Sequence, residues 1–189
     1  EKLDRLTSGW QPSDLIIVAA RPGMGKTAFT LSMARNISVE NNMPVAFFSL
    51  EMSAIQLITR LISSETGLNS EKLRTGKLEK FEWELLNVKV TNLENAPLYI
   101  DDTPSLSIFE LRAKARRLSS QFGIKLIVVD YLQLMTLGSS QKSGNREQEI
   151  STISRNLKAL AKELDIPIIA LSQLSRAVEL RGGTKRPIL

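Results

Sequence analysis

The sequence has no cysteine and no histidine among its 189 residues. Their absence excludes disulfide bonds, zinc sites built from these residues, thiol nucleophiles and Ser-His-Asp catalytic triads. The lack of cysteine also fits a reducing compartment, although it does not require one. No apolar run approaches the roughly 18 residues that a membrane-spanning helix needs, and the start, Glu-Lys-Leu-Asp, is unlike a signal peptide. We therefore expect no membrane association.

The composition is that of an ordinary globular protein. Hydrophobic residues make up 42% of the chain and charged residues 24%, which are typical values for soluble domains. The length suits one domain with a sizeable core, or a piece of a larger protein. The formal net charge of +5 suits a polyanionic partner such as a nucleic acid, although basic residues often do no more than solvate a surface.

Residues 20–27 read Ala-Arg-Pro-Gly-Met-Gly-Lys-Thr, between an apolar run (15–19) and a helix-like segment (28–34). A strand, a glycine-rich turn ending in Gly-Lys-Thr and a helix are typical of a phosphate-binding loop. We expect Lys26 to reach the β and γ phosphates of a nucleotide and the Thr27 hydroxyl to ligate magnesium. The nucleotide-binding residues predicted in this way are Arg21, Pro22, Gly23, Met24, Gly25, Lys26, Thr27 and Ala28.

The loop departs from the strict pattern at one position, where Ala20 replaces the first glycine. Alanine is the smallest residue with a Cβ atom, so the loop can close if this position does not need a positive φ. The competing interpretation is an ordinary strand-turn-helix that carries Gly-Lys-Thr by chance.

Three further apolar runs end in residues that suit phosphate chemistry. The run 45–50 ends at Glu51, the run 126–129 ends at Asp130, and the run 167–171 is followed by Ser172 and Gln173. With a strand at 97–100, the chain alternates five strands with helices, which predicts an α/β fold with a parallel sheet covered on both faces. The carboxyl ends of parallel strands share one edge, so we expect these side chains to converge on the phosphate loop.

In-line attack of water on a γ-phosphate needs a group that orients and deprotonates the water, a metal that offsets charge, and a donor that senses the phosphate. Glu51 suits the base, Gln173 suits the sensor, and Thr27 with Asp130 suits the magnesium site.

The remaining signals are mostly structural. Capping-box patterns at Ser53 and Ser107 predict helix starts. Residues 70–95 predict one or two more helices, whose aromatic side chains we interpret as core. Asp101 and Asp102 invite a metal site, but a capping or solvated role is favoured. The helix from 108 to 122 has a basic face that is solvated, or else binds nucleic acid or another subunit; its residues are Arg112, Lys114, Arg116 and Arg117.

Five stretches resemble the bacterial replicative DNA helicases of the DnaB type, in the order and at the spacing of that family. They are 14–27, 48–52 (Phe-Ser-Leu-Glu-Met), 129–135 (Val-Asp-Tyr-Leu-Gln-Leu-Met), 157–164 and 171–176 (Leu-Ser-Gln-Leu-Ser-Arg). The resemblance spans essentially the whole chain. It implies a RecA-like motor domain with the sheet order 3-2-4-5-1 and ATP hydrolysis with Mg²⁺. It also implies a homo-hexameric ring that translocates on single-stranded DNA and unwinds the duplex at the replication fork, with a primase and a helicase loader as partners in the cytoplasm.

The same resemblance implies roles for individual positions. The catalytic glutamate is Glu51, the magnesium-associated aspartate is Asp130 and the phosphate-sensing glutamine is Gln173. Two basic loops, 136–146 and 175–186, are expected to face the central channel and contact the DNA backbone. The family's amino-terminal domain, linker helix, arginine finger and last strands have no counterpart in the sequence. We therefore expect residues 1–189 to be a single motor domain, truncated at both ends.

Other functions remain open at this point. A RecA-type recombinase or a clock-type ATPase would share Glu51, Asp130 and Gln173, but the sequences Ser-Leu-Glu-Met and Asp-Tyr-Leu-Gln-Leu favour the helicase. A small-molecule phosphotransferase would need an arginine lid and an acceptor pocket, for which the sequence offers no candidate. An inactive nucleotide-binding module would not need a carboxylate at Glu51.

Overall fold

A computed structural model describes residues 2–138 and 146–174 of the chain. Five strands form one parallel sheet in the order β1-β5-β4-β2-β3. They are β1 (Leu15–Ala20), β2 (Val45–Ser49), β3 (Leu98–Asp101), β4 (Leu126–Asp130) and β5 (Ile168–Gln173). Read from the other edge, the order is 3-2-4-5-1, so the predicted topology is confirmed. The whole of the second basic loop, 175–186, lies outside the described residues, as does the part of the first loop from 139 to 145.

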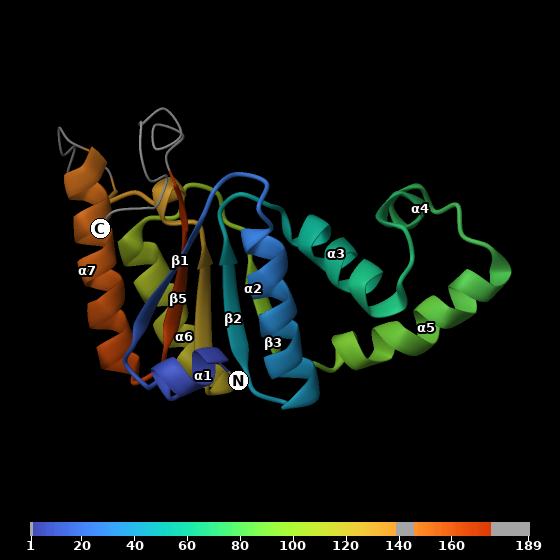
Figure 1. Ribbon diagram of the computed structural model, residues 1–189, viewed down its shortest axis with the longest axis horizontal. Helices are drawn as coiled ribbons and strands as arrows, with labels where there is room; N and C mark the ends of the chain where they lie inside the picture. The colour runs from blue at the N-terminus through green and yellow to red at the C-terminus, as the bar shows by residue number, and fades with distance from the viewer. Residues whose placement is uncertain (1, 139–145, 175–189) are drawn as a thin grey trace.

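Apart from the first, which precedes β1, the helices lie in the crossovers between the strands (Figure 1). They are α1 (Lys2–Thr7), α2 (Lys26–Arg35), α3 (Ala54–Thr66), α4 (Ser70–Thr75), α5 (Lys80–Glu94), α6 (Ile108–Phe122) and α7 (Arg146–Leu164). A π-helical turn, η1 (Asn36–Glu40), continues α2, and a 3-10 turn, η2 (Leu132–Leu134), follows β4. Ser53 and Ser107 start α3 and α6 with capping boxes, as predicted. No helix in the described ranges is long and apolar enough to cross a bilayer.

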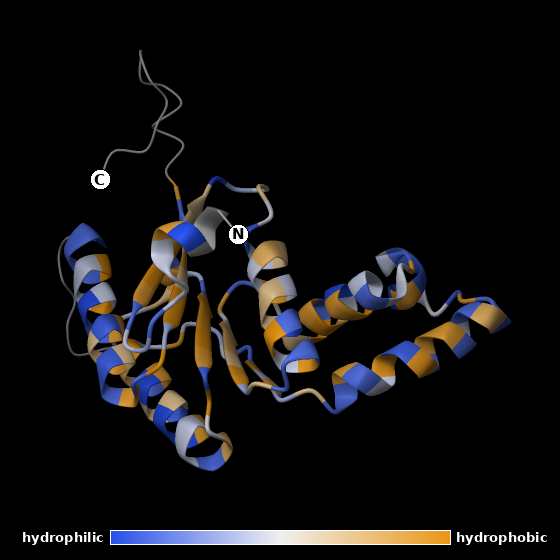
Figure 2. Ribbon diagram, turned by 60° about the horizontal axis from the view of Figure 1, so that its bottom comes forward, coloured by the Kyte–Doolittle hydropathy of each residue, from blue (hydrophilic) through white to orange (hydrophobic). Residues whose placement is uncertain are grey.

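The sheet separates two hydrophobic layers, because alternate residues of each strand face opposite sides. In β2, Ala46 and Phe48 pack against the layer formed with α6 and α7, whereas Val45 and Phe47 pack against the layer formed with α2 and α3. Figure 2 shows the strands as mainly hydrophobic and the surrounding helices as mixed. All five residues of β2 and of β4 are buried, as expected for strands covered on both faces. The helices on both faces hold the sheet and so fix the positions of the residues at its carboxyl-end edge.

The α4–α5 region corrects one expectation. Both helices project from the side of the sheet beyond α3, and the start of α5 lies farthest from the strands (Figure 1). Phe81 is 66% exposed and Trp83 is 45% exposed, so these aromatic side chains are not core. The buried side chain here is Glu82, whose carboxylate accepts bonds from Lys72 Nζ at 2.7 Å and from the backbone N–H of Glu79 at 2.9 Å. Both aromatic side chains are therefore substantially exposed in the described part of the chain.

Two acidic residues at the end of β3 behave as structural groups, as favoured from the sequence. Asp102 Oδ2 accepts a bond from the backbone N–H of Ala54 at 2.7 Å, which caps the start of α3. Asp101 Oδ2 pairs with Lys114 Nζ at 2.6 Å. Within the described residues, no group of three or more acidic side chains could hold a metal ion by itself.

Most basic side chains of α6 form ion pairs with other residues of the chain. Arg112 Nη2 lies 2.5 Å from Glu163 of α7, and Arg116 bonds the same carboxylate. Because Lys114 also has its partner in Asp101, three of the four basic residues join neighbouring elements. This pairing argues against the nucleic-acid interpretation of that face.

Candidate nucleotide-binding site

The phosphate loop lies between the end of β1 and the first turn of α2. Gly23 has a φ of +74° and Gly25 a φ of +80°, a left-handed conformation that costs other residues roughly 1–2 kcal/mol. A Cβ atom at either position would meet no atom within 4 Å, so glycine is required by conformation and not by space. Ala20 is the last residue of β1 and is not among the described residues with positive φ, which explains why alanine is tolerated there.

The first turn of α2 buries the two residues expected to act on phosphate and metal. Lys26 and Thr27 are each only 9% exposed. The Thr27 hydroxyl donates to Asp130 Oδ2 at 2.6 Å, which joins the loop directly to the end of β4. Lys26 Nζ lies 5.3 Å from the centroid of the Tyr131 ring, a cation–π distance. The structure therefore brings three predicted residues together and adds Tyr131, whose role the sequence did not indicate.

Asp130 is fully buried, and its Oδ1 atom has no hydrogen-bond partner. Burial raises the pKa of this carboxyl, the Thr27 hydrogen bond lowers it, the charge of Glu51 raises it, and Lys26 and Arg60 lower it; the net shift is upward. An orphaned oxygen of this kind is costly unless a donor reaches it. A water of a hydrated Mg²⁺ would be such a donor, since this ion binds proteins through few direct ligands and keeps several waters. The residues therefore fit the predicted magnesium site.

Glu51 follows β2 and is exposed at the same edge of the sheet. The backbone N–H of its neighbour Leu50 donates to the carbonyl of Asp130 at 2.7 Å, which fixes the chain beside β4 just before the glutamate. The negative charge of Glu51 also contributes, after burial, to raising the pKa of Tyr131. The predicted base and the predicted metal residue thus lie close to each other.

Gln173 ends β5 directly beside the phosphate loop. It pairs with Ala20 in the register of β1 and β5, and the N–H of Leu174 donates to the Ala20 carbonyl at 3.0 Å. On the other side, the side-chain amide of Gln133 bonds the backbone of Gln173. Gln133 belongs to the Asp-Tyr-Leu-Gln-Leu segment, but nothing in the sequence assigned it a role. Both bonds use the Gln173 backbone and leave its side-chain amide available.

The sequence model of one protein family, the DnaB-like helicase C-terminal domain, matches residues 1–189. The chain belongs to this family. Its sequence is 55% identical to the replicative DNA helicase DnaB of Geobacillus stearothermophilus over 188 residues, and 50% identical to the replicative DNA helicase DnaC of Bacillus subtilis (strain 168) over 188 residues. In both comparisons the whole chain is covered, but it spans only 41% of the relative's length.

Two solved structures share the fold. One, described as an ATPase domain, superimposes with a TM-score of 0.88 at 38% identity, with all of this chain and 66% of that chain covered. The other, a DnaB-like replicative helicase described with its interactions with primase, gives a TM-score of 0.87 at 38% identity and is covered over 45% of its length. The RecA-like fold predicted from the DnaB resemblance is therefore confirmed.

Proposed function

We propose that this chain is the motor domain of a replicative DNA helicase, in which ATP hydrolysis drives movement along single-stranded DNA and separation of the duplex. The observation that carries the proposal is the bond between Thr27 and Asp130, which joins a phosphate loop to a buried carboxylate, in a chain of the DnaB-like family. The catalytic residues would be Lys26, Glu51 and Gln173, and the nucleotide would lie on residues 21–28.

The phosphate loop binds the nucleotide through its backbone. Gly23 and Gly25 turn consecutive N–H groups toward the phosphates, and the positive end of the α2 dipole adds to the attraction. Lys26, whose Nζ atom lies 5.3 Å from the centroid of the Tyr131 ring, pairs with the β and γ phosphates.

Thr27 and Asp130 are the residues that would hold Mg²⁺. The ion would offset negative charge on the transferring phosphoryl group. Glu51 orients the attacking water and accepts its proton. The Gln173 amide donates to the γ-phosphate and distinguishes ATP from ADP.

The parts of the proposal that concern assembly rest on the relatives. Named relatives are replicative helicases, and one solved neighbour is described with primase. We infer by analogy a homo-hexamer on forked or single-stranded DNA, a primase and a helicase loader as partners, and a cytoplasmic location. The net charge of +5 supports contact with a phosphate backbone. The affinity for single-stranded DNA is then expected to fall steeply between about 50 and 200 mM salt, and an affinity that does not respond to salt would contradict backbone contact.

The experiment is ATP hydrolysis by the intact parent protein, with and without single-stranded DNA, for the wild type, Lys26→Ala and Glu51→Gln. We expect DNA to stimulate the wild type, Lys26→Ala to bind ATP weakly and not turn it over, and Glu51→Gln to bind ATP while kcat falls by about 10²–10³. Near-normal turnover in Glu51→Gln would refute the assignment of the base. Turnover that ignores DNA but rises with a small acceptor would favour a phosphotransferase.

A further inference from the structure

We propose that Gln133 is a positioning residue that fixes the backbone of Gln173, and that Arg146 fixes Gln133 in turn. The inference deepens the proposed function and rests on it, because it takes Gln173 as the residue that contacts the γ-phosphate. Neither Gln133 nor Arg146 touches the nucleotide in this scheme. Both act by fixing the Gln173 backbone, which in turn places the side-chain amide of Gln173.

The sheet leaves one side of Gln173 without a strand partner. On the β1 side, the register continues to the pair Ala20 and Gln173. On the β4 side, it stops three residues earlier, at the pair Val129 and Ala170. Beyond that point β4 has ended at Asp130, and the chain has turned into η2. The last residues of β5 would therefore have an open edge on this side.

The Gln133 side chain fills that edge as a strand would. Its Oε1 accepts the Gln173 N–H at 3.1 Å, and its Nε2 donates to the Gln173 carbonyl at 3.2 Å and to Ser172 Oγ at 2.9 Å. In a strand, the N–H and C=O of one residue point to the same side, so an amide side chain, with an acceptor and a donor in one plane, can satisfy both as a neighbouring peptide group would. The two bonds fix both the position and the rotation of the Gln173 peptide groups, and with them the direction of its side chain.

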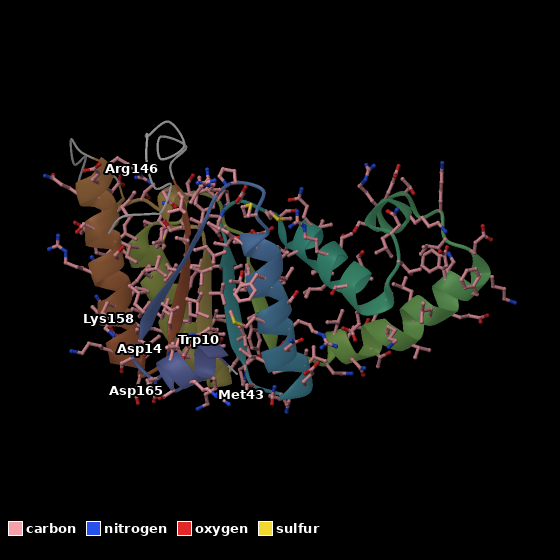
Figure 3. All side chains as sticks on the ribbon, in the orientation of Figure 1. Trp10, Asp14, Met43, Arg146, Lys158 and Asp165 are labelled. Carbon is pink, nitrogen blue, oxygen red and sulfur yellow. The ribbon has the colours of Figure 1, made fainter. Side chains whose placement is uncertain are left out.

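Gln133 is itself held from the other end, by Arg146. The Nη2 atom of Arg146 donates to the Gln133 carbonyl at 2.6 Å and to the Met135 carbonyl at 3.1 Å. Its Nη1 atom pairs with Glu149, whose Oε1 accepts the N–H of Leu137 at 3.3 Å. Figure 3 shows Arg146 at the end of α7 that lies at the carboxyl-end edge of the sheet. A planar guanidinium holds its N–H donors in a fixed fork, so it positions two carbonyls and a carboxylate more precisely than the freely rotating ammonium group of a lysine.

These contacts connect the first turn of α7 to the end of β5 through two side chains. A shift of the α7 start changes the carbonyls that Arg146 holds, and a shift of Gln133 changes the Gln173 backbone. A displacement of about 1 Å in a group that contacts the reacting phosphate can cost about a hundredfold in rate. We therefore expect loss of Gln133 to reduce kcat while the phosphate loop, and hence ATP binding, is left intact.

The test measures ATP turnover and ATP affinity of the full-length parent protein without DNA. Gln133→Met keeps the side-chain volume and removes all three hydrogen bonds. We expect kcat to fall by about tenfold with KM for ATP changed less than about twofold. Gln121→Met, on the exposed surface of α6, is the matched control and is expected to leave both constants unchanged.

Arg146 is tested in the same assay. Arg146→Lys is expected to lose part of the rate and Arg146→Met more of it, while Arg155→Met, an exposed arginine of the same helix, loses none. Melting temperatures of all variants separate this effect from loss of folding. A large fall in melting temperature for Gln133→Met together with a normal kcat for the folded fraction would overturn the inference, because Gln133 would then only stabilise the fold.

A double-mutant cycle with Gln173→Ala distinguishes positioning from general damage. If Gln133 acts only through Gln173, the double variant turns over ATP no more slowly than Gln173→Ala alone. An additional tenfold loss in the double variant would overturn the inference. A Gln173→Ala variant with normal turnover would refute the sensor assignment, and the inference with it. Normal turnover in Gln133→Met beside an impaired Gln173→Ala would refute the inference alone.

Discussion

Replacing Asp130 by asparagine is expected to stabilise the nucleotide-free protein and to inactivate it. Asp130 is fully buried, and its Oδ1 atom has no partner. Asparagine has nearly the same shape, keeps an acceptor for the Thr27 hydroxyl and removes the buried negative charge. Without magnesium and nucleotide, the ionised carboxylate is therefore a cost to folding that the variant avoids.

The size of the effect follows from the orphaned oxygen. An unsatisfied buried polar group costs about 1–3 kcal/mol, and a charged one costs more. The asparagine amide leaves its own N–H groups without partners, so the variant gains only the difference between the two costs. We expect a gain of about 1–2 kcal/mol in the free energy of unfolding at neutral pH. For a chain of this size, that corresponds to a rise of roughly 2–8 °C in melting temperature.

The pH dependence of the difference has a definite sign. Burial is the first cause that raises the pKa of Asp130 above its ordinary value. The folded state therefore binds more protons than the unfolded state between the ordinary and the raised pKa, and wild-type stability increases as pH falls through this window. The advantage of Asp130→Asn is expected to be largest at neutral pH and to shrink in acid.

The assay is thermal unfolding of the chain in EDTA without nucleotide, with Asp101→Asn as the matched control. Burial tends to raise the pKa of Asp101, but hydrogen bonds from Lys114 and Thr103 outweigh it and hold the pKa below its ordinary value, so this variant should be destabilised. Addition of Mg²⁺ and ATP should stabilise the wild type more than Asp130→Asn, whose turnover falls by at least about a hundredfold. A loss of about 1 kcal/mol or more in Asp130→Asn without ligand would refute the reasoning.

Three further outcomes are expected. Gly25→Ala and Gly76→Ala each impose a positive φ on alanine and should each cost about 1–2 kcal/mol, but only Gly25→Ala should weaken ATP binding in a titration; equal affinities would contradict the loop assignment. Hydrogen bonds from Arg116 and Arg112 lower the pKa of Glu163 to about 2. The stability that Glu163 contributes is therefore present above its ordinary pKa and is lost as pH falls toward 2. The melting temperatures of Glu163→Gln and wild type should converge in acid, and a difference that does not change with pH would contradict the pairing. In denaturant unfolding, Phe81→Ser should change stability by less than about 0.5 kcal/mol, whereas Phe47→Ala should cost about 3–5 kcal/mol; a large effect at position 81 would mean that another surface covers it.

The parts of the fold that local chemistry determines could be predicted from the sequence. Continuous apolar runs became buried strands because both faces of the sheet are covered, and the serine capping boxes began α3 and α6 at the predicted residues. The sheet order has a different origin. Which of several parallel strands are neighbours depends on long-range packing, so 3-2-4-5-1 came from the resemblance to DnaB-type helicases and not from any local pattern.

The α4–α5 region shows where composition misleads. Phe81 and Trp83 are residue types that usually lie in a core, yet both are exposed on α5, a helix that projects beyond the sheet. Glu82, between them, is buried because Lys72 and the Glu79 N–H satisfy its charge. Neither fact can be read from the residue types, since each depends on how far α5 extends beyond the sheet.

The positions of Gln133 and Tyr131 could not be predicted for a related reason. Parallel strands of unequal length leave backbone groups without partners at the carboxyl-end edge, where ligands bind. Here β4 stops pairing with β5 at Ala170, and the N–H and carbonyl of Gln173 are satisfied by a side chain. Such a side chain need not be catalytic in type or close in sequence to the residue that it holds. It can be found only once the strand register is known, and the register shows directly where to look for it: beyond the last ladder pair.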